Sequence, residues 1–104
     1  MRKTYNKLVR DRIPEIIEAA GGKCKTEILS DEKYIEMLDA KLDEEVAEYH
    51  KDKSIEELAD LLEVIYAIAV VHGYSVDELE YTRIKKAFKR GAFNKKIFLL
   101  ETIE

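Results

Sequence analysis

The segment from Leu61 to Val71 is apolar at every position except Glu63, and it limits the possible folds more than any other part of the sequence. Its longest uninterrupted apolar run, from Val64 to Val71, has eight residues, whereas a membrane-spanning helix needs about 20. A helix that is apolar on nearly every side must be buried among other elements of the protein. The segment therefore predicts the central helix of a helical domain and no membrane span.

Capping residues and glycines divide the chain into four predicted helices. A serine followed three residues later by a glutamate is typical of a helix start, and a glycine is typical of a helix end. With Ser54 and Ser75 as such starts, Ser30-Asp31 as a cap and Pro14 as a first helical residue, the helices cover about residues 14–20, 31–50, 55–72 and 76–90. The apolar stripe of the second helix consists of Ile35, Leu38, Leu42, Val46 and Tyr49.

These elements predict a single all-α domain over residues 1–104, folded as a four-helix bundle. Residues 23–29 and 97–100 are β-prone and can add a short two-stranded accessory. Three helices hardly cover a fourth that is apolar all round, so we expect self-association as a dimer or tetramer. The chain has one cysteine, Cys24, and no apolar signal core at its start, which indicates a cytoplasmic protein.

The charges of the chain are segregated, although the net charge is only −4. Residues 27–63 contain fourteen acidic and four basic residues, whereas residues 83–96 contain seven basic residues and no acidic one. Residues 1–12 add five basic residues and one acidic residue. An acidic centre between basic ends suits a metal-bound polyphosphate as ligand. On charge alone, ion pairs between solvated helix faces are the simpler interpretation. The acidic balance disfavours nucleic-acid binding.

Four acidic residues interrupt helix faces that are otherwise apolar. At about 100° per residue, Glu45 falls inside the apolar stripe of the second helix, and Glu48 falls on its border. Glu44 falls on the far side of that helix and is expected to face solvent. Glu57 and Asp60 lie on the side of the third helix that continues as Val64, Ala67, Ile68 and Val71.

The two acidic pairs are expected at the same level of two antiparallel helices. Glu45 with Glu48 and Glu57 with Asp60 are i, i+3 pairs, and the short polar turn at residues 51–53 reverses the chain. Carboxylates that share one small space repel one another unless a cation lies between them, and Lys41 can neutralise only one of them. Hard carboxylate oxygens suit Mg²⁺, with Mn²⁺ as a substitute.

Other interpretations of these residues stay open. Glu57 is also the capping-box partner of Ser54, and the remaining acidic side chains can reach solvent from the edge of the stripe. A di-iron bundle is excluded, because it needs Glu-x-x-His on two helices. Alanine stands at that spacing before both His50 and His72.

The acidic pattern resembles that of a known superfamily. Glu44-Glu45-x-x-Glu48, followed by Glu57-x-x-Asp60 on the next helix, is similar to the all-α nucleoside triphosphate pyrophosphohydrolases. This superfamily includes the MazG-like proteins, phosphoribosyl-ATP pyrophosphohydrolase and the dimeric dUTPases. Only eight residues separate the two acidic pieces here, fewer than is usual in the family, which leaves less room for a loop over the substrate.

Basic residues and the chain ends extend the resemblance over almost the whole sequence. Lys86-x-x-x-Arg90 looks like the basic element on the helix that follows in the family. The segments 5–11 and 90–93 are similar to a small MazG-like subgroup related to phosphoribosyl-ATP pyrophosphohydrolase. The resemblance therefore implies a MazG-like bundle.

The resemblance also implies an activity and roles for individual residues. The expected reaction is Mg²⁺-dependent hydrolysis of a nucleotide between its α- and β-phosphates, which gives a nucleoside monophosphate and pyrophosphate. The substrate would be a nucleoside triphosphate in a house-cleaning role, or phosphoribosyl-ATP. The implied metal ligands are Glu45, Glu48, Glu57 and Asp60, and Glu48 or Glu44 would orient or deprotonate the attacking water.

The implied phosphate-binding residues are basic side chains near both ends of the chain. They are Lys86 and Arg90 and, as further candidates, Lys7, Arg10, Lys95 and Lys96. The alternative function is a non-catalytic helical module whose degenerate site binds a nucleotide or a partner helix. Neither interpretation predicts a base or sugar preference.

Overall fold

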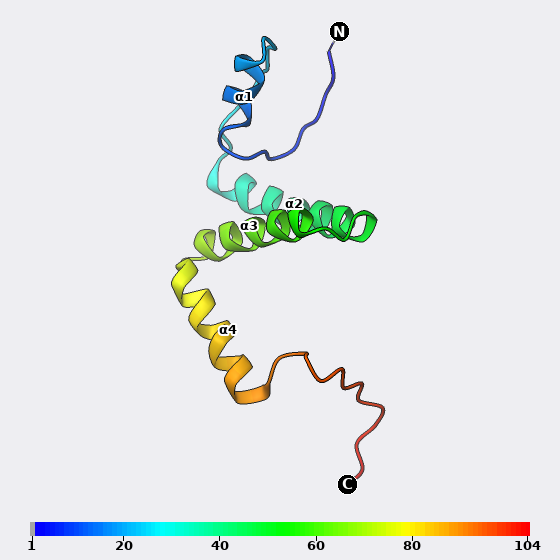
Figure 1. Ribbon diagram of the computed structural model, residues 1–104. Coiled ribbons are helices and arrows are strands. Elements are labelled where there is room, and N and C mark those ends of the chain that lie inside the picture. Colours follow the sequence, from blue (N-terminus) through cyan, green and yellow to red (C-terminus); the bar gives the residue numbers. More distant parts are fainter. Residues whose placement is uncertain (1) are drawn as a thin grey trace.

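Serine caps and one proline set where the helices begin. A computed structural model describes residues 2–104 and contains four helices (Figure 1). They are α1 (Ile13–Ala19), α2 (Asp31–Lys51), α3 (Ile55–Val71) and α4 (Val76–Arg90). The predicted all-α class and the four helices are confirmed, with boundaries within a residue or two of those expected.

The caps explain these boundaries. The Ser30, Ser54 and Ser75 hydroxyls each accept a hydrogen bond from the backbone N–H three residues later, which satisfies an otherwise free donor of the first turn. A complete capping box forms only at Ser75, where the Glu78 carboxylate also accepts from the Ser75 N–H at 3.2 Å. The box expected at Ser54 is half formed, because the Glu57 side chain is turned elsewhere. At its other end, α4 stops at Gly91, whose φ of 86° is readily accessible to glycine.

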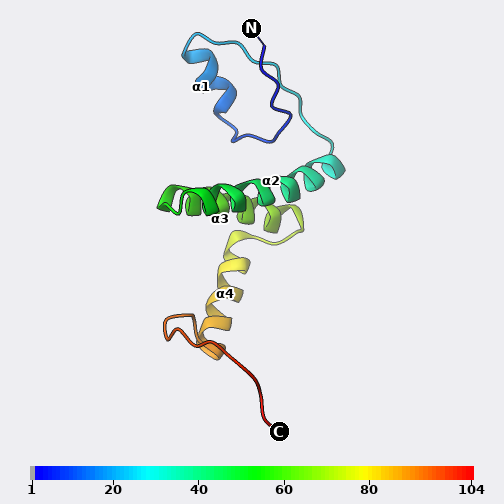
Figure 2. The same ribbon diagram turned by 90° about the vertical axis from the view of Figure 1, so that its right-hand side faces the viewer.

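Helices α2 and α3 form an antiparallel hairpin and lie side by side in both views (Figures 1 and 2). They meet along the predicted faces, because Leu38 of α2 and Val64 of α3 are the buried apolar residues of the described chain. The turn between them is short, over residues 52–54. The hairpin is therefore the folded centre of the molecule, and it carries the acidic residues of interest.

Helix α4 and the segment after it leave the hairpin instead of covering it. The chain bends by 110° between α3 and α4, and α4 has no buried residue. The side of α3 opposite α2 is consequently uncovered at Ile55, Leu58, Leu62 and Ile65. The described chain measures 63 × 31 × 23 Å and has a radius of gyration of 18.3 Å, against about 13 Å for a compact domain of 100 residues. One chain does not close into a bundle.

The prediction of a short two-stranded accessory is wrong. Neither residues 23–29 nor residues 97–100 form a strand in the described part of the chain. The two segments follow α1 and α4, which lie on opposite sides of the hairpin, so they cannot pair within one chain (Figure 1). Over residues 2–104, no single helix is long and apolar enough to cross a membrane. Helices α3 and α4 reach that length and apolar composition only when they are taken together, and they are bent by 110° relative to each other.

Candidate metal centre

Three carboxylates converge between the helices of the hairpin. Glu45 from α2 and Glu57 and Asp60 from the first two turns of α3 each offer an oxygen atom, and these oxygens all lie within 4.8 Å of one another. Glu45 is only 8% exposed and is the one buried charged residue of the described chain. Glu57 and Asp60 are half-buried. The convergence predicted from helix phase and level is confirmed for these three side chains.

Glu48 lies beside this group without belonging to it. It is half-buried one turn after Glu45 on α2, and it is absent from the set of oxygens that come within 4.8 Å of one another. Burial, together with the negative charges of Asp60, Glu48 and Glu45, raises the pKa of Glu57. The predicted quartet is therefore a close trio with a fourth carboxylate near enough to influence it.

Two cations reach the trio. The Arg10 guanidinium donates to Asp60 Oδ1 at 2.7 Å and lies 3.6 Å from a Glu63 carboxylate oxygen. The Lys41 ammonium lies 3.4 Å from Glu45 and donates to both Glu44 oxygens at 3.3 Å. Arg10 was not expected beside these carboxylates, and the N-terminal segment brings it to α3 from fifty residues away.

Glu44 is also placed differently from the prediction. It is half-buried, and the Lys7 ammonium donates to it at 3.1 Å. Burial opposes ionisation of Glu44, but the hydrogen bonds from Lys7 and Lys41 outweigh it and lower the pKa of this carboxyl. The cause is again the N-terminal segment, whose residues 6–8 lie against α2 and share with it a surface hollow of about 190 Å³.

The donor set fits a hard divalent cation. Two oxygens bound to one Mg²⁺ lie at most about 4.2 Å apart, so small side-chain rotations would bring the three carboxylates into range. Asp60 gives one oxygen to Arg10, and its second oxygen has no hydrogen-bond partner among the described residues. Six carboxylates (Glu44, Glu45, Glu48, Glu57, Asp60 and Glu63) face three cations (Lys7, Arg10 and Lys41). The neighbourhood therefore keeps an excess of negative charge, and Glu57 has no ion pair among the described residues.

The predicted phosphate-binding residues fall into two groups. Lys7 and Arg10 lie at the acidic neighbourhood. Lys86 and Arg90 do not, because α4 begins about 16 Å along α3 from Asp60 and then turns away (Figure 1). Both are exposed on α4.

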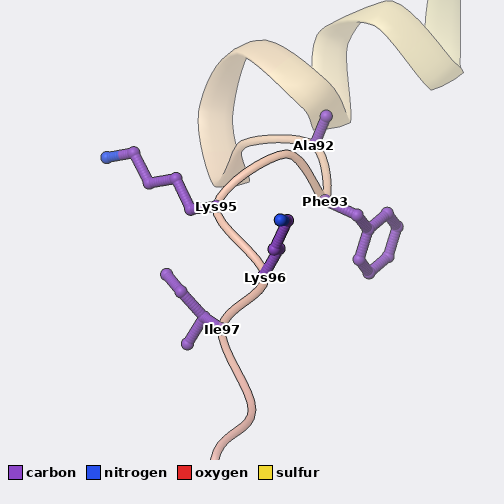
Figure 3. A pocket seen from close by; sticks show the side chains of 5 residues that line it. All are labelled: Ala92, Phe93, Lys95, Lys96 and Ile97. Carbon is purple, nitrogen blue, oxygen red and sulfur yellow. The ribbon is translucent and has the colours of Figure 1, made fainter.

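Lys95 and Lys96 lie still farther along the chain. With Ala92, Phe93 and Ile97 they line a surface hollow of about 130 Å³. Figure 3 shows Lys95 and Phe93 directed to opposite sides of this hollow. The two lysines therefore do not converge with the acidic residues in one chain.

One polar contact, between α3 and α4, was not predicted from the sequence. The Tyr66 hydroxyl of α3 donates to Glu80 of α4 at 2.7 Å, and Arg83 donates to the same carboxylate at 2.8 Å. Glu80 accepts both bonds, which lowers its pKa, and the Tyr66 pKa rises because its proton is held. Only the i, i+3 spacing of Glu80 and Arg83 was visible in the sequence. The contact ties the start of α4 to α3 at the bend.

Comparison with known proteins gives one partial similarity. The chain is 63% identical over 41 residues to a protein of Mycolicibacterium smegmatis described as uncharacterized. This similarity covers 39% of the present chain and 42% of that protein, so less than half of its length is matched. No family model and no solved structure matches the chain.

Proposed function

We propose that this protein is a Mg²⁺-dependent nucleotide pyrophosphohydrolase of the MazG-like type. It would cleave a nucleoside triphosphate, or phosphoribosyl-ATP, between the α- and β-phosphates to give a nucleoside monophosphate and pyrophosphate. The observation that carries the proposal is the meeting of Glu45, Glu57 and Asp60 from two antiparallel helices. The resemblance of the same acidic pattern to the pyrophosphohydrolase superfamily supplies the reaction.

Glu45, Glu57 and Asp60 would hold the metal, and Glu48 would complete or border the set. Mg²⁺ bound there would neutralise charge on the phosphate oxygens and make a bound water more acidic. Glu57 suits a ligand role, because its anionic form is disfavoured without a cation and is relieved by one. Glu44 suits it less, since Lys7 and Lys41 already occupy its oxygens.

The chain's own residues would perform the remaining tasks. Lys7 and Arg10 lie next to the carboxylates and would hold phosphate oxygens by charge-assisted hydrogen bonds. Glu48 is half-buried and has no ion pair in the described chain, so it is the better of the two predicted bases. It would take a proton from water as the water oxygen bonds to phosphorus and the bridging oxygen departs with the leaving group.

A pyrophosphate-release assay tests the proposal. The screen uses Mg²⁺ with common, deoxy and damaged nucleoside triphosphates and with phosphoribosyl-ATP. We expect turnover of at least one substrate, and loss of it in Glu45→Gln and Asp60→Asn with the helical circular dichroism unchanged. Glu56→Gln is the matched control, because Glu56 precedes Glu57 on α3 but is exposed. Full turnover in Glu45→Gln would remove the trio from the mechanism.

The non-catalytic module remains the second candidate, and one observation favours it. The hollow that Glu44, Lys7 and Lys41 help to line has a volume of about 190 Å³, below the roughly 300–1,000 Å³ of typical ligand pockets. A module would bind Mg²⁺ with nucleotide and melt at a higher temperature, because a ligand of the folded state stabilises it. It would release no pyrophosphate from any substrate in the screen.

A further inference from the structure

The last quarter of the chain exposes many large apolar side chains. We call residues 76–103, which comprise α4 and the segment that follows, the C-terminal arm. Nine of its large apolar side chains are between 56% and 98% exposed. They are Tyr81, Ile84, Phe88, Phe93, Ile97, Phe98, Leu99, Leu100 and Ile103.

The arm's exposed area is large for a surface that stays in water. An aromatic side chain has about 150–250 Å² of surface to bury. Phe88, Phe93 and Phe98 alone therefore expose more than about 400 Å², whereas the largest apolar patch on a monomer is typically about 300–600 Å² in total. The six further aliphatic and aromatic residues add to this exposed apolar area.

A complementary surface lies on α3. Ile55, Leu58, Leu62 and Ile65 form one stripe along the helix, on the side opposite Val64, and they are 36–79% exposed. We call these four residues the α3 outer face. Their spacing of i, i+3, i+7 and i+10 is that of a seam between packed helices. Tyr81, Ile84 and Phe88 on α4 have the spacing i, i+3 and i+7 as well. One chain therefore carries two apolar stripes that can each form one side of such a seam, and we call each of them a half-seam.

The two half-seams do not meet within one chain. The 110° bend directs α4 away from α3, and the Tyr66–Glu80 hydrogen bond of 2.7 Å holds the two helices at that bend. The stripe on α3 therefore needs an occupant from outside the chain, and so does the arm.

Charge identifies this occupant as a second copy of the same chain. The segment 83–96 of the arm has seven basic residues and no acidic one, whereas residues 27–63, which include most of the hairpin, have fourteen acidic and four basic residues. An arm therefore attracts a hairpin, while two arms or two hairpins repel one another. The apolar half-seams and the charges thus favour the same pairing.

We propose that two copies of this chain exchange their C-terminal arms, each α4 packing on the α3 outer face of the other. A two-fold arrangement forms two identical interfaces and leaves no half-seam uncovered. A stable interface buries about 800 Å² on each partner, and the nine arm residues and four face residues supply an area of that order. The exchange does not depend on the enzymatic activity proposed above.

Light scattering coupled to size-exclusion chromatography tests the exchange. We expect a mass of at least twice the 12.1 kDa of one chain for the wild type, and 12.1 kDa for Phe88→Asp. Phe88 is 95% exposed in the single chain, so the substitution leaves the fold of that chain intact. Ile28→Asp is the matched control, because Ile28 is 98% exposed but lies outside both surfaces, and it should keep the wild-type mass.

A mixing experiment separates arm exchange from other dimers. Ile55→Asp on the outer face should also give single chains, and circular dichroism checks that its helices persist. Mixed in equal amounts, the two variants should recover a dimer, because the intact arm of the Ile55→Asp chain fits the intact face of the Phe88→Asp chain. A face-to-face dimer predicts no recovery and an undiminished mass for Phe88→Asp, and either result overturns the proposal.

A wild-type mass of 12.1 kDa at micromolar concentration would equally overturn it. Sedimentation of that single chain with phosphatidylserine-containing vesicles would then assign the arm to a lipid surface. A radius of gyration near 13 Å in solution scattering would instead show that the arm folds back onto its own hairpin.

Discussion

Removal of the positive charge of Arg10 should tighten divalent cation binding while it weakens catalysis. Arg10 lies 2.7 Å from Asp60, so its charge would be about 5 Å from a metal held by the other Asp60 oxygen. At that separation the repulsion between one and two positive charges is about 1.7 kcal/mol in water. Ions at physiological strength reduce it to about 1 kcal/mol. Arg10→Met should therefore bind Mn²⁺ about five-fold more tightly than the wild type.

Calorimetric titration of the two proteins with Mn²⁺ measures this difference. The difference should shrink in 1 M salt, because the screening length falls to about 3 Å. Arg12→Met is the control, because Arg12 pairs with Glu15 at 3.3 Å and not with the trio. Pyrophosphate release by Arg10→Met should fall, because the proposed phosphate contact is lost. Unchanged or weaker Mn²⁺ binding in this variant would refute a cation site beside Asp60.

Three further predictions concern stability. Burial and nearby negative charges, Asp60 foremost among them, raise the pKa of Glu57 above 4.5. The folded protein therefore loses stability as the pH rises from 4.5 through the raised pKa of Glu57. Glu57→Gln should melt at a higher temperature than the wild type at pH 7, and Mg²⁺ should no longer raise the melting temperature of this variant. An equal melting temperature at pH 7 would contradict this reasoning. Leu38→Ala should lower the free energy of unfolding by about 2–3 kcal/mol in urea titrations, since Leu38 is 4% exposed, while Ile28→Ala should change it by less than about 0.5 kcal/mol. Ser75→Ala removes the hydroxyl that accepts from the Glu78 N–H but keeps the backbone N–H that donates to the Glu78 carboxylate. It should lower the free energy of unfolding by about 1 kcal/mol, and an unchanged value in urea titrations would show that α4 does not depend on this cap.

Local signals predicted the helices well, and they predicted three of the four carboxylates correctly. The serine caps fix the starts of α2, α3 and α4 through hydrogen bonds with residues three positions later. Contacts of such short range can be predicted from the sequence. The phase of Glu45, Glu57 and Asp60 follows from helix geometry alone. A tight turn then makes α2 and α3 antiparallel, so the three side chains meet without further information.

Features set by irregular segments were not predictable in the same way. Residues 2–12 are not helical, and no periodicity shows that Arg10 crosses to Asp60 or that Lys7 crosses to Glu44. The only signal was the segregation of basic and acidic residues, which gives a tendency to pair without giving the partners. The position of Lys86 and Arg90 depends on the bend before α4, and a polar contact between helices fixes that bend.

The three converging carboxylates come from sixteen consecutive residues, Glu45 to Asp60. A helix–turn–helix of this length carries the whole acidic constellation, so the constellation is inherited as one piece. Insertions or losses elsewhere in the gene would alter assembly, or the cations that surround the constellation, without separating its members. The same short stretch is therefore the part of the protein most easily grafted onto another helical hairpin.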